Sequence, residues 1–253
     1  MSKAGALTKQ SPGKSKYERW QATVDDAVRD ARWHEYDCDI QRTVTTFNRH
    51  LTGSGYVPLD WRIVKAMIWT ESGGPKNPAW KSNPMQIGNE GDPGLRALLF
   101  GNEGGELIMP ATLRQQLTIT SVASTPRKNI EAGTAYLLMR HARYDIRTVR
   151  QVDDTRIHTV EVRAGDSLDK IARQNDTTIE ILKQRNASSA VLRPGQTLQY
   201  QKGRLRKAIV GWELITPASI ARRYNVGDSE YSRKLNYCLE VMRRSKPGEP
   251  ACE

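Results

Sequence analysis

Residues 61–74 read WRIVKAMIWTESGG, an apolar, helix-like run that carries one carboxylate near its end and stops at two glycines. Val64, Met67 and Ile68 precede Glu71 by seven, four and three residues, the spacing that puts side chains on one face of an α-helix. We therefore expect Glu71 to face the interior near a helix C-terminus. Burial and the negative end of the helix dipole both disfavour a charged carboxylate there, so we predict a raised pKa. A carboxylic acid that keeps its proton near neutral pH can act as a general acid.

Three further segments accompany Glu71 in the chain. They read NPMQIG at 83–88, NIEAGTAYL at 129–137 and ARRYNVG at 221–227. Together with Glu71-Ser72 they resemble, in the same order, the signatures of the soluble lytic transglycosylases, which are related to goose-type lysozyme: Glu-Ser, Gly-Leu-Met-Gln, Asn-Ile-x-x-Gly-x-x-Tyr-Leu and Ala-Tyr-Asn. The resemblance implies a lysozyme-like helical fold that cleaves peptidoglycan glycan strands. On its own, the glutamate fits a structural residue that is paired with an arginine or capped by backbone amides.

The resemblance also implies residue roles. Glu71 matches the catalytic acid and base. The residues that match the sugar-binding positions are Ser72, Met85, Gln86, Tyr136, Tyr224 and Asn225. Two stretches depart from the family pattern, because Asn83-Pro84 stands in place of Gly-Leu and Gly73-Gly74 in place of the common Asn and aromatic residue. These departures leave the shape of the cleft near the scissile bond open, and the tyrosine on the 129–137 helix also fits as a core aromatic.

Most glycosidases use two carboxylates. The family that this chain resembles is an exception, because it uses one. The resemblance implies that one acid protonates the bond between N-acetylmuramic acid and N-acetylglucosamine, that the sugar's acetamido group assists, and that the C6 hydroxyl then attacks to leave a 1,6-anhydro end. This hydroxyl lies on the same ring, so its effective concentration is high. Glu90, Asp92 and Glu103 follow the Met-Gln motif. Any of them could supply a second carboxylate for a hydrolytic muramidase, although the neighbouring glycines and Pro93 favour solvated loop charges.

A second unit is predicted at 156–202 from a β-α-α-β pattern. Residues 158–162, HTVEV, alternate as a strand, helical spacing begins at Leu168, and TTIE at 177–180 has capping-box spacing for another helix. Residues 192–200, LRPGQTLQY, give a turn and a closing strand. This order resembles a LysM domain, which binds N-acetylglucosamine-containing glycans through two loops. The residues that match these loops are Gly165, Asp166, Ser167, Leu168, Asn186, Ala187, Ser188 and Leu192. The aspartate and serine also fit as helix caps without any ligand.

Paired antiparallel, the two strands of this unit would bring its ends together, so it can be inserted into a loop of a host domain. We therefore predict a mainly α fold in which a lysozyme-like domain, formed by 17–155 and 203–253, is interrupted by the LysM domain. Residues 1–16 are basic and poor in apolar side chains, which predicts a disordered tail.

The segment that carries the last signature has a rival interpretation. Residues 219–227, SIARRYNVG, also resemble the middle of a second LysM domain. Such a copy would need a closing Pro-Gly-Gln strand, but the chain continues with NYCLEVMRR at 236–244, a helical pattern with basic residues in its last turns. We favour a C-terminal helix pair of the lysozyme-like domain.

The net charge of +11 over 253 residues is compatible with an anionic partner. We expect acidic peptidoglycan rather than nucleic acid, because the basic residues are spread along the chain and no nucleic-acid motif is present. The four histidines lack metal-ligand spacing, so we predict no metal and no other cofactor.

Cys38, Cys238 and Cys252 allow one disulfide at most. A Cys38–Cys238 bridge would tie the two ends of the chain together, and reduced thiols are the alternative.

The chain contains no apolar run long enough for a signal peptide or a membrane span. The implied substrate lies in the bacterial periplasm or cell wall. We therefore expect delivery by a specialised secretion machine, such as type VI secretion, as an antibacterial effector with a cognate immunity protein. A phage-borne enzyme and a chain whose signal has been removed are the other two routes. The competing function from another class is a wall-binding protein whose catalytic fold has decayed.

Overall fold

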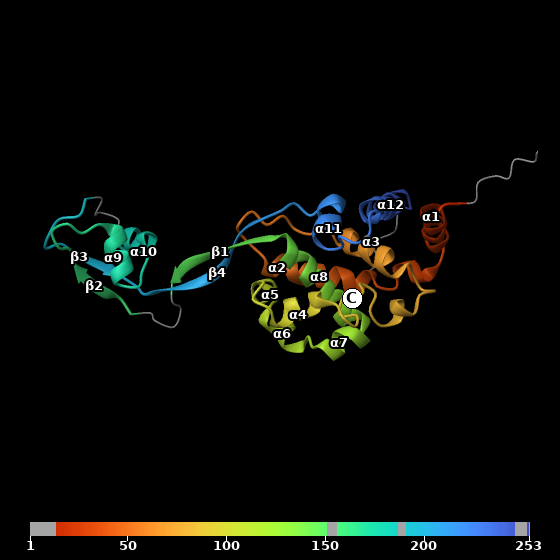
Figure 1. The fold of residues 1–253 in the computed structure, drawn as a ribbon, viewed down its shortest axis with the longest axis horizontal. Helices are drawn as coiled ribbons and strands as arrows, with labels where there is room; N and C mark the ends of the chain where they lie inside the picture. Colours follow the sequence, from red (N-terminus) through yellow and green to blue (C-terminus); the bar gives the residue numbers. More distant parts are fainter. Residues whose placement is uncertain (1–13, 151–155, 187–190, 246–251, 253) are drawn as a thin grey trace, which may run out of the picture. The chain divides into compact units, whose positions relative to one another are not determined.

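Two compact units make up the computed structural model, which describes residues 14–150, 156–186, 191–245 and 252. Unit 1 combines the chain up to residue 142 with the chain from 211 onward, and unit 2 is formed by 143–210. Most of the elements are helices, which confirms the predicted mainly α fold (Figure 1).

The boundaries of unit 2 lie outside the predicted 156–202 because of a two-stranded ribbon. Strand β1 (Ala142–Arg150) is hydrogen-bonded to strand β4 (Gly203–Trp212) in a sheet of their own. The sequence analysis predicted neither strand. A strand is recognised in a sequence when one of its faces is buried, because apolar and polar residues then alternate. Ile146 of β1 is 59% exposed, so this signal is weak in the ribbon.

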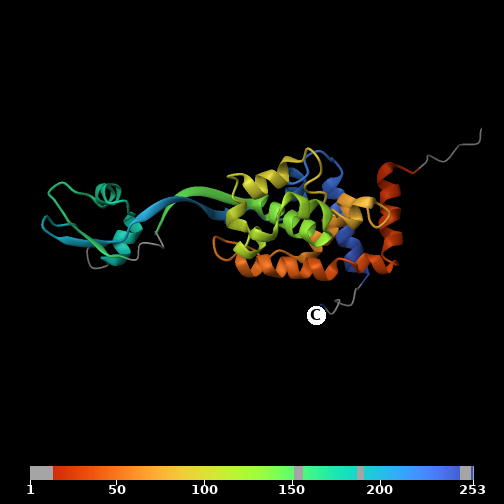
Figure 2. The same ribbon diagram turned by 90° about the horizontal axis from the view of Figure 1, so that it is seen from below.

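Unit 1 is a bundle of helices. Its elements are α1 (Lys16–Ala27), α2 (Asp37–His50), α3 (Trp61–Ser72), α4 (Pro93–Phe100), α5 (Gly105–Ile108), α6 (Ala111–Gln116), α7 (Ile119–Ser124), α8 (Pro126–His141), α11 (Pro217–Arg223) and α12 (Tyr231–Arg244), with 3-10 turns at Ala31–His34 and Pro78–Lys81. Helix α3 packs against α2 and α12, and α8 packs against α2, α4, α5 and α7. Figure 2 shows α2 running along the unit and α1 crossing its end.

Helix α3 is buried around most of its circumference, not only on the face predicted from its spacing. Its buried residues include Val64, Lys65, Ala66, Met67, Ile68 and Trp69. A helix covered on all sides is a core helix. The buried lysine is accommodated because its ammonium group pairs with the buried Asp37 carboxylate at 2.7 Å.

An aromatic cluster fixes the point where the chain leaves α3. The ring of Trp69 lies 4.6 Å from that of Trp33 and 4.8 Å from that of Trp80. Gly74 has φ of +96°, and a Cβ atom there would lie 2.3 Å from the Trp69 ring. Only glycine fits this position, so the Gly-Gly pair both ends the helix and lets the chain pass the tryptophan.

The cysteine pairing differs from the predicted one. Cys38 of α2 forms a disulfide with Cys252, and Cys238 of α12 is a free, buried thiol. The Cys38–Cys238 prediction is therefore wrong. Cys238 lies on the interior face of α12 with Leu235 and Val241, where it packs as a small apolar side chain.

The predicted tail, 1–16, lies mostly outside the described residues. Its last residues have a defined structure, since Lys16 is the first residue of α1 and Ser15 is the N-cap. The Ser15 hydroxyl accepts from the Glu18 amide, and the Glu18 carboxylate accepts from the Ser15 amide, which is a capping box.

Unit 2 contains the predicted β-α-α-β order. Strand β2 (His158–Glu161) pairs antiparallel with β3 (Thr197–Tyr200), and α9 (Leu168–Gln174) and α10 (Ile179–Arg185) connect them. The core is formed by Val162, Ile171, Ala172, Leu182, Leu198 and Tyr200. The N-cap of α10 is Thr178, not Thr177, because Thr177 donates its hydroxyl hydrogen bond to the Gln201 carbonyl at 2.6 Å.

Candidate active site

Glu71 lies in the last turn of α3, where the sequence placed it. Gly73 ends the helix in the left-handed conformation with φ of 66°. The Glu71 carboxylate is mostly buried and accepts two hydrogen bonds at Oε1, from the Tyr231 hydroxyl at 2.6 Å and from Asn225 Nδ2 at 3.5 Å. Both donors come from the C-terminal end of the chain, so segments far apart in sequence complete the environment of this acid.

The pKa of Glu71 is raised, as predicted. Burial is the largest cause, and the negative charge of Asp228 acts in the same direction. The hydrogen bonds from Tyr231 and Asn225 stabilise the carboxylate and oppose the rise in pKa, as does the charge of Lys234. The net effect favours the protonated acid, which is the form a general acid needs.

The loop at 85–88 passes next to Glu71. Gln86 has φ of 52°, and its side-chain amide donates to the Glu71 carbonyl. Asn129 of α8 holds this loop in place. Its Oδ1 accepts from the Met85 amide at 2.8 Å, and its Nδ2 donates to the Ile87 carbonyl at 2.9 Å. The predicted Met-Gln and Asn-Ile segments are thus linked by direct hydrogen bonds.

Tyr224 closes the same side of the site. Its hydroxyl donates to the Met85 carbonyl at 3.4 Å, and its ring meets the Tyr136 ring edge-on at a centroid distance of 5.4 Å. Burial, followed by the charge of Glu71, raises the pKa of Tyr224 well above its ordinary value, so its hydroxyl stays protonated. The structure therefore brings the four predicted segments together around Glu71.

Two of the expected sugar-binding residues have structural roles instead. Ser72 is buried, and its hydroxyl donates to the Ile68 carbonyl at 2.7 Å within α3. The Met85 side chain is 1% exposed and packs on Gly133 of α8, where a Cβ atom would lie 2.6 Å from the methionine sulfur. Neither side chain faces solvent. The methionine anchors the 85–88 loop in the core.

Tyr231 is the residue of the candidate site that the sequence analysis missed. It donates the shortest hydrogen bond to the Glu71 carboxylate, and burial keeps its pKa well above the ordinary value. It lies on the interior face of α12 with Leu235, Cys238 and Met242. That helical spacing was visible in the sequence, but it predicts a core tyrosine as readily as a partner of an acid.

The site also has a second charged pair. Asp228, in the turn between α11 and α12, accepts from Lys234 Nζ at 2.6 Å and from the Glu230 amide at 2.9 Å. Burial acts to raise the pKa of Asp228, but the hydrogen bonds from Lys234 and the Glu230 amide outweigh it, and the pKa is lowered. The pair thus places an ionised carboxylate and an ammonium within electrostatic reach of Glu71.

The three carboxylates that follow the Met-Gln motif differ in their surroundings. Asp92 caps α4, because its two oxygens accept from the Gly94 and Gly88 amides at 2.7 and 2.8 Å. Glu103 is exposed and lies 3.6 Å from Arg140. Glu90 is exposed. These positions agree with the interpretation as loop charges.

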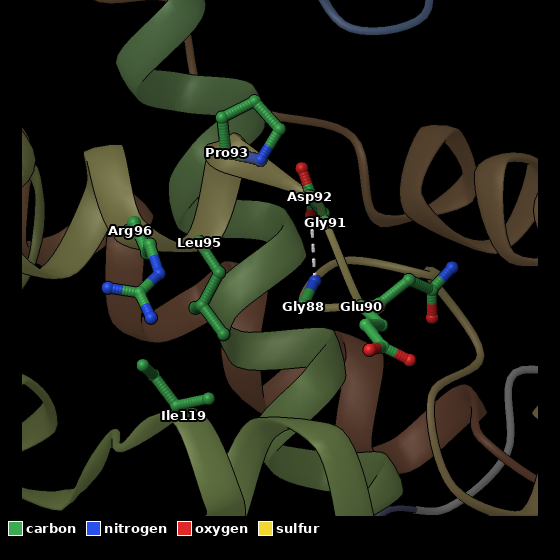
Figure 3. A pocket seen from close by; sticks show the side chains of 9 residues that line it. Gly88, Glu90, Gly91, Asp92, Pro93, Leu95, Arg96 and Ile119 are labelled. Atoms are coloured by element: carbon green, nitrogen blue, oxygen red, sulfur yellow. Dashed lines mark hydrogen bonds between the residues drawn. The ribbon is translucent and has the colours of Figure 1, made fainter.

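A pocket opens beside the loop that holds Gln86. Figure 3 shows it between the 88–93 segment, the first residues of α4, and Ile119 of α7. Its volume is about 390 Å³. Ile119, which is 39% exposed, gives the pocket an apolar surface, and Arg96 and Glu90 add opposite charges to its lining.

The expected glycan-binding residues of unit 2 mostly have internal partners. Asp166 accepts from the Arg163 amide at 2.8 Å, Ser167 caps α9, and Asn186 bonds both backbone groups of Gln199. Leu168 and Leu192 pack against the core of the unit. Gly165 is exposed in a turn with φ of +80°. Ala187 and Ser188 lie outside the described residues.

Among the described residues, no group of three or more His, Cys, Asp or Glu side chains is arranged to hold a metal ion. None of the helices in the described part of the chain is long and apolar enough to cross a membrane.

Comparison with known proteins identifies one domain. Residues 160–200 match the LysM domain family. This stretch is a LysM domain. The match agrees with the β2-α9-α10-β3 fold of unit 2 and indicates binding of peptidoglycan or chitin, and hence of glycan strands, as a function of the chain. No curated protein and no solved structure matches the chain.

Proposed function

We propose that unit 1 is a peptidoglycan lytic transglycosylase, and that the LysM domain holds the enzyme on its glycan substrate. The observation that carries the proposal is the mostly buried Glu71 with its raised pKa, at the point where the 85–88 loop, α8 and the C-terminal helix pair meet. The LysM domain supports the choice of substrate, because both units would then act on the same polymer.

In this mechanism Glu71 protonates the oxygen between N-acetylmuramic acid and N-acetylglucosamine. The resulting carboxylate is stabilised by the hydroxyl of Tyr231 and the amide of Asn225, which already face it. It then accepts the proton of the C6 hydroxyl as that oxygen attacks C1 of the same sugar, and a 1,6-anhydro end forms. The two donors therefore stabilise the carboxylate that forms when the C1–O bond breaks in the first half of the reaction, whereas burial keeps Glu71 protonated before that step and makes the carboxylate a stronger base in the second half.

A hydrolytic muramidase is the second candidate, and Asp228 is the observation that favours it. This carboxylate is ionised and acts on Glu71, so it could activate a water molecule on the opposite face of the sugar. Its hydrogen bonds to Lys234 and the Glu230 amide restrict that use, because both of its oxygens are already occupied.

Digestion of purified sacculi distinguishes the candidates. We expect soluble fragments with 1,6-anhydro ends, identified by mass. Fragments heavier by one water would identify a muramidase, and binding without release would leave only an adaptor role for the chain.

The Tyr231→Phe variant tests the role of the missed tyrosine. Removing the hydroxyl removes a donor that stabilises the Glu71 carboxylate, so the pKa of Glu71 rises further. The protonated acid then persists to higher pH, and the alkaline limb of the kcat/KM profile is expected to move upward. The maximal rate should fall roughly tenfold, because a hydrogen bond to a charged group is lost. A lower rate with an unshifted limb would show that Tyr231 only packs.

We also propose an oxidising site of action, the periplasm or cell wall, and delivery as an antibacterial effector. The Cys38–Cys252 disulfide supports the compartment, because such bonds persist where thiols are not kept reduced. The proposal includes a cognate immunity protein that covers the site at Glu71. The gene neighbourhood tests this proposal: secretion components and a small inhibitor gene are expected beside the native gene, and the absence of both would contradict it.

A further inference from the structure

The ribbon formed by β1 and β4 belongs neither to the LysM fold nor to the proposed cleavage site. Its two strands pair only with each other in the described part of the chain (Figure 1). Successive side chains of a strand point to opposite faces. In β1, Arg143, Asp145 and Arg147 therefore lie on one face of the ribbon, and Tyr144 and Ile146 lie on the other.

A contact between the strands assigns the faces of β4. Lys207 Nζ lies 5.7 Å from the centre of the Tyr144 ring, so this lysine is on the tyrosine face. Ile209 follows the lysine by two residues and shares its face, whereas Arg206 is on the opposite face. The ribbon is thus amphipathic, with an arginine face and a face of apolar and aromatic side chains around one lysine.

The arginine face carries excess positive charge. Arg143, Arg147 and Arg206 are exposed, and within the described residues only Arg147 has an ion-pair partner. That partner is Asp145, at 3.9 Å, and both side chains are more than half exposed, so the pair neutralises little of the charge. The opposite face is open as well, because Ile146 is 59% exposed.

The two faces together fit the surface of an anionic bilayer. Apolar side chains such as Ile146 can enter the boundary between lipid head groups and acyl chains. Arginine side chains are long enough to reach past a ribbon of two strands to the head groups, and they bind phosphate oxygens in pairs. A soluble polyanion, such as a nucleic acid, would engage the arginines but would leave the isoleucine in water.

We propose that this ribbon lies on the surface of an anionic phospholipid membrane. Tyr144, Ile146 and Ile209 would lie in the interface, and the three arginines of the opposite face would contact lipid phosphates. The inference goes beyond the proposed function, because it adds a membrane surface to the partners of the chain and does not depend on the chemistry at Glu71.

Sedimentation of the full-length chain with lipid vesicles tests the role of the arginines. We expect the wild type to bind vesicles of phosphatidylglycerol and phosphatidylcholine in equal parts, and not to bind phosphatidylcholine alone. Replacing the three ribbon arginines together by glutamine should weaken this binding about 100-fold, because each basic residue near an anionic surface contributes roughly fivefold. The matched control makes the same change at three exposed arginines of unit 1 and should weaken binding at most about twofold; these are Arg49, Arg96 and Arg114.

Ile146→Thr distinguishes a membrane from a soluble polyanion. Threonine keeps the β-branched shape that suits a strand but removes apolar surface, so vesicle binding should fall about fivefold while binding of polyphosphate stays unchanged. The proposal is overturned if the wild type does not bind the anionic vesicles, if the control loses as much affinity as the ribbon variant, or if Ile146→Thr binds the vesicles as tightly as the wild type. Fragment release from sacculi is measured separately, so failure of the proposed function would leave this test unchanged.

Discussion

Glu71→Gln is expected to abolish release of glycan fragments from sacculi, with a loss of roughly 10³-fold or more, because in the proposed mechanism this one residue supplies both the acid and the base. Glutamine keeps the size of the side chain and can still accept the hydrogen bond from the Tyr231 hydroxyl. Binding to sacculi should be unchanged, since the LysM domain is not altered. Pull-down and fragment release, measured on the same sample, separate the two functions. Release at the wild-type rate would mean that another residue is the acid.

The pH dependence of the stability of Glu71→Gln provides a second test, and the raised pKa of Glu71 fixes the direction of the expected change. A glutamate whose pKa is raised in the folded state contributes stability that is fully present below its unfolded pKa and is lost as the pH rises through the folded pKa. Glu71→Gln should therefore be at least as stable as the wild type at neutral pH and show a flatter dependence of Tm on pH above the ordinary pKa of a glutamate. Glu103→Gln is the matched control, because it removes an exposed carboxylate of the same unit, and both its activity and its stability should stay near wild type.

The sequence predicted the surroundings of Glu71 because the helical spacing around this residue agreed with the motifs found further along the chain. The spacing before Glu71 and the glycine pair after it determine where α3 ends, and helix α3 indeed ends at Ser72. The rival interpretation of residues 219–227 was resolved by the 14-residue helix α12, whose Tyr231 contacts Glu71. No closing strand follows α11 in the described residues.

The features that could not be predicted depend on tertiary contacts. Periodicity shows that Tyr231 faces the interior, but not which buried group its hydroxyl meets. Spacing cannot select Cys252 over Cys238 as the partner of Cys38, because the choice depends on how the C-terminal end of the chain returns to α2. In the LysM domain, motif positions such as Asn186 proved to bond the backbone, since the same polar residues serve turns and ligands alike.

Asn129→Ala is expected to damage both the stability of unit 1 and its activity. The Asn129 side chain is fully buried and bonds the Met85 amide and the Ile87 and Val122 carbonyls, at 2.8, 2.9 and 3.0 Å. Alanine leaves these backbone groups buried without a partner, at a cost of about 1–3 kcal/mol each. We expect the free energy of unfolding to fall by at least about 3 kcal/mol and Tm by roughly 10 °C.

The activity of Asn129→Ala should fall further than the loss of folded protein explains, because Gln86 and the carbonyl that accepts from Tyr224 lie on the loop that Asn129 clamps. Asn129→Asp keeps the acceptor for the Met85 amide and should show an intermediate loss. Asn186→Ala is the matched control, since it removes a similarly bonded asparagine from unit 2 and should weaken sacculus binding without lowering the cleavage rate on soluble strands. If folded Asn129→Ala cleaved as fast as the wild type, the position of the 85–88 loop would not be what prepares Glu71 for proton transfer.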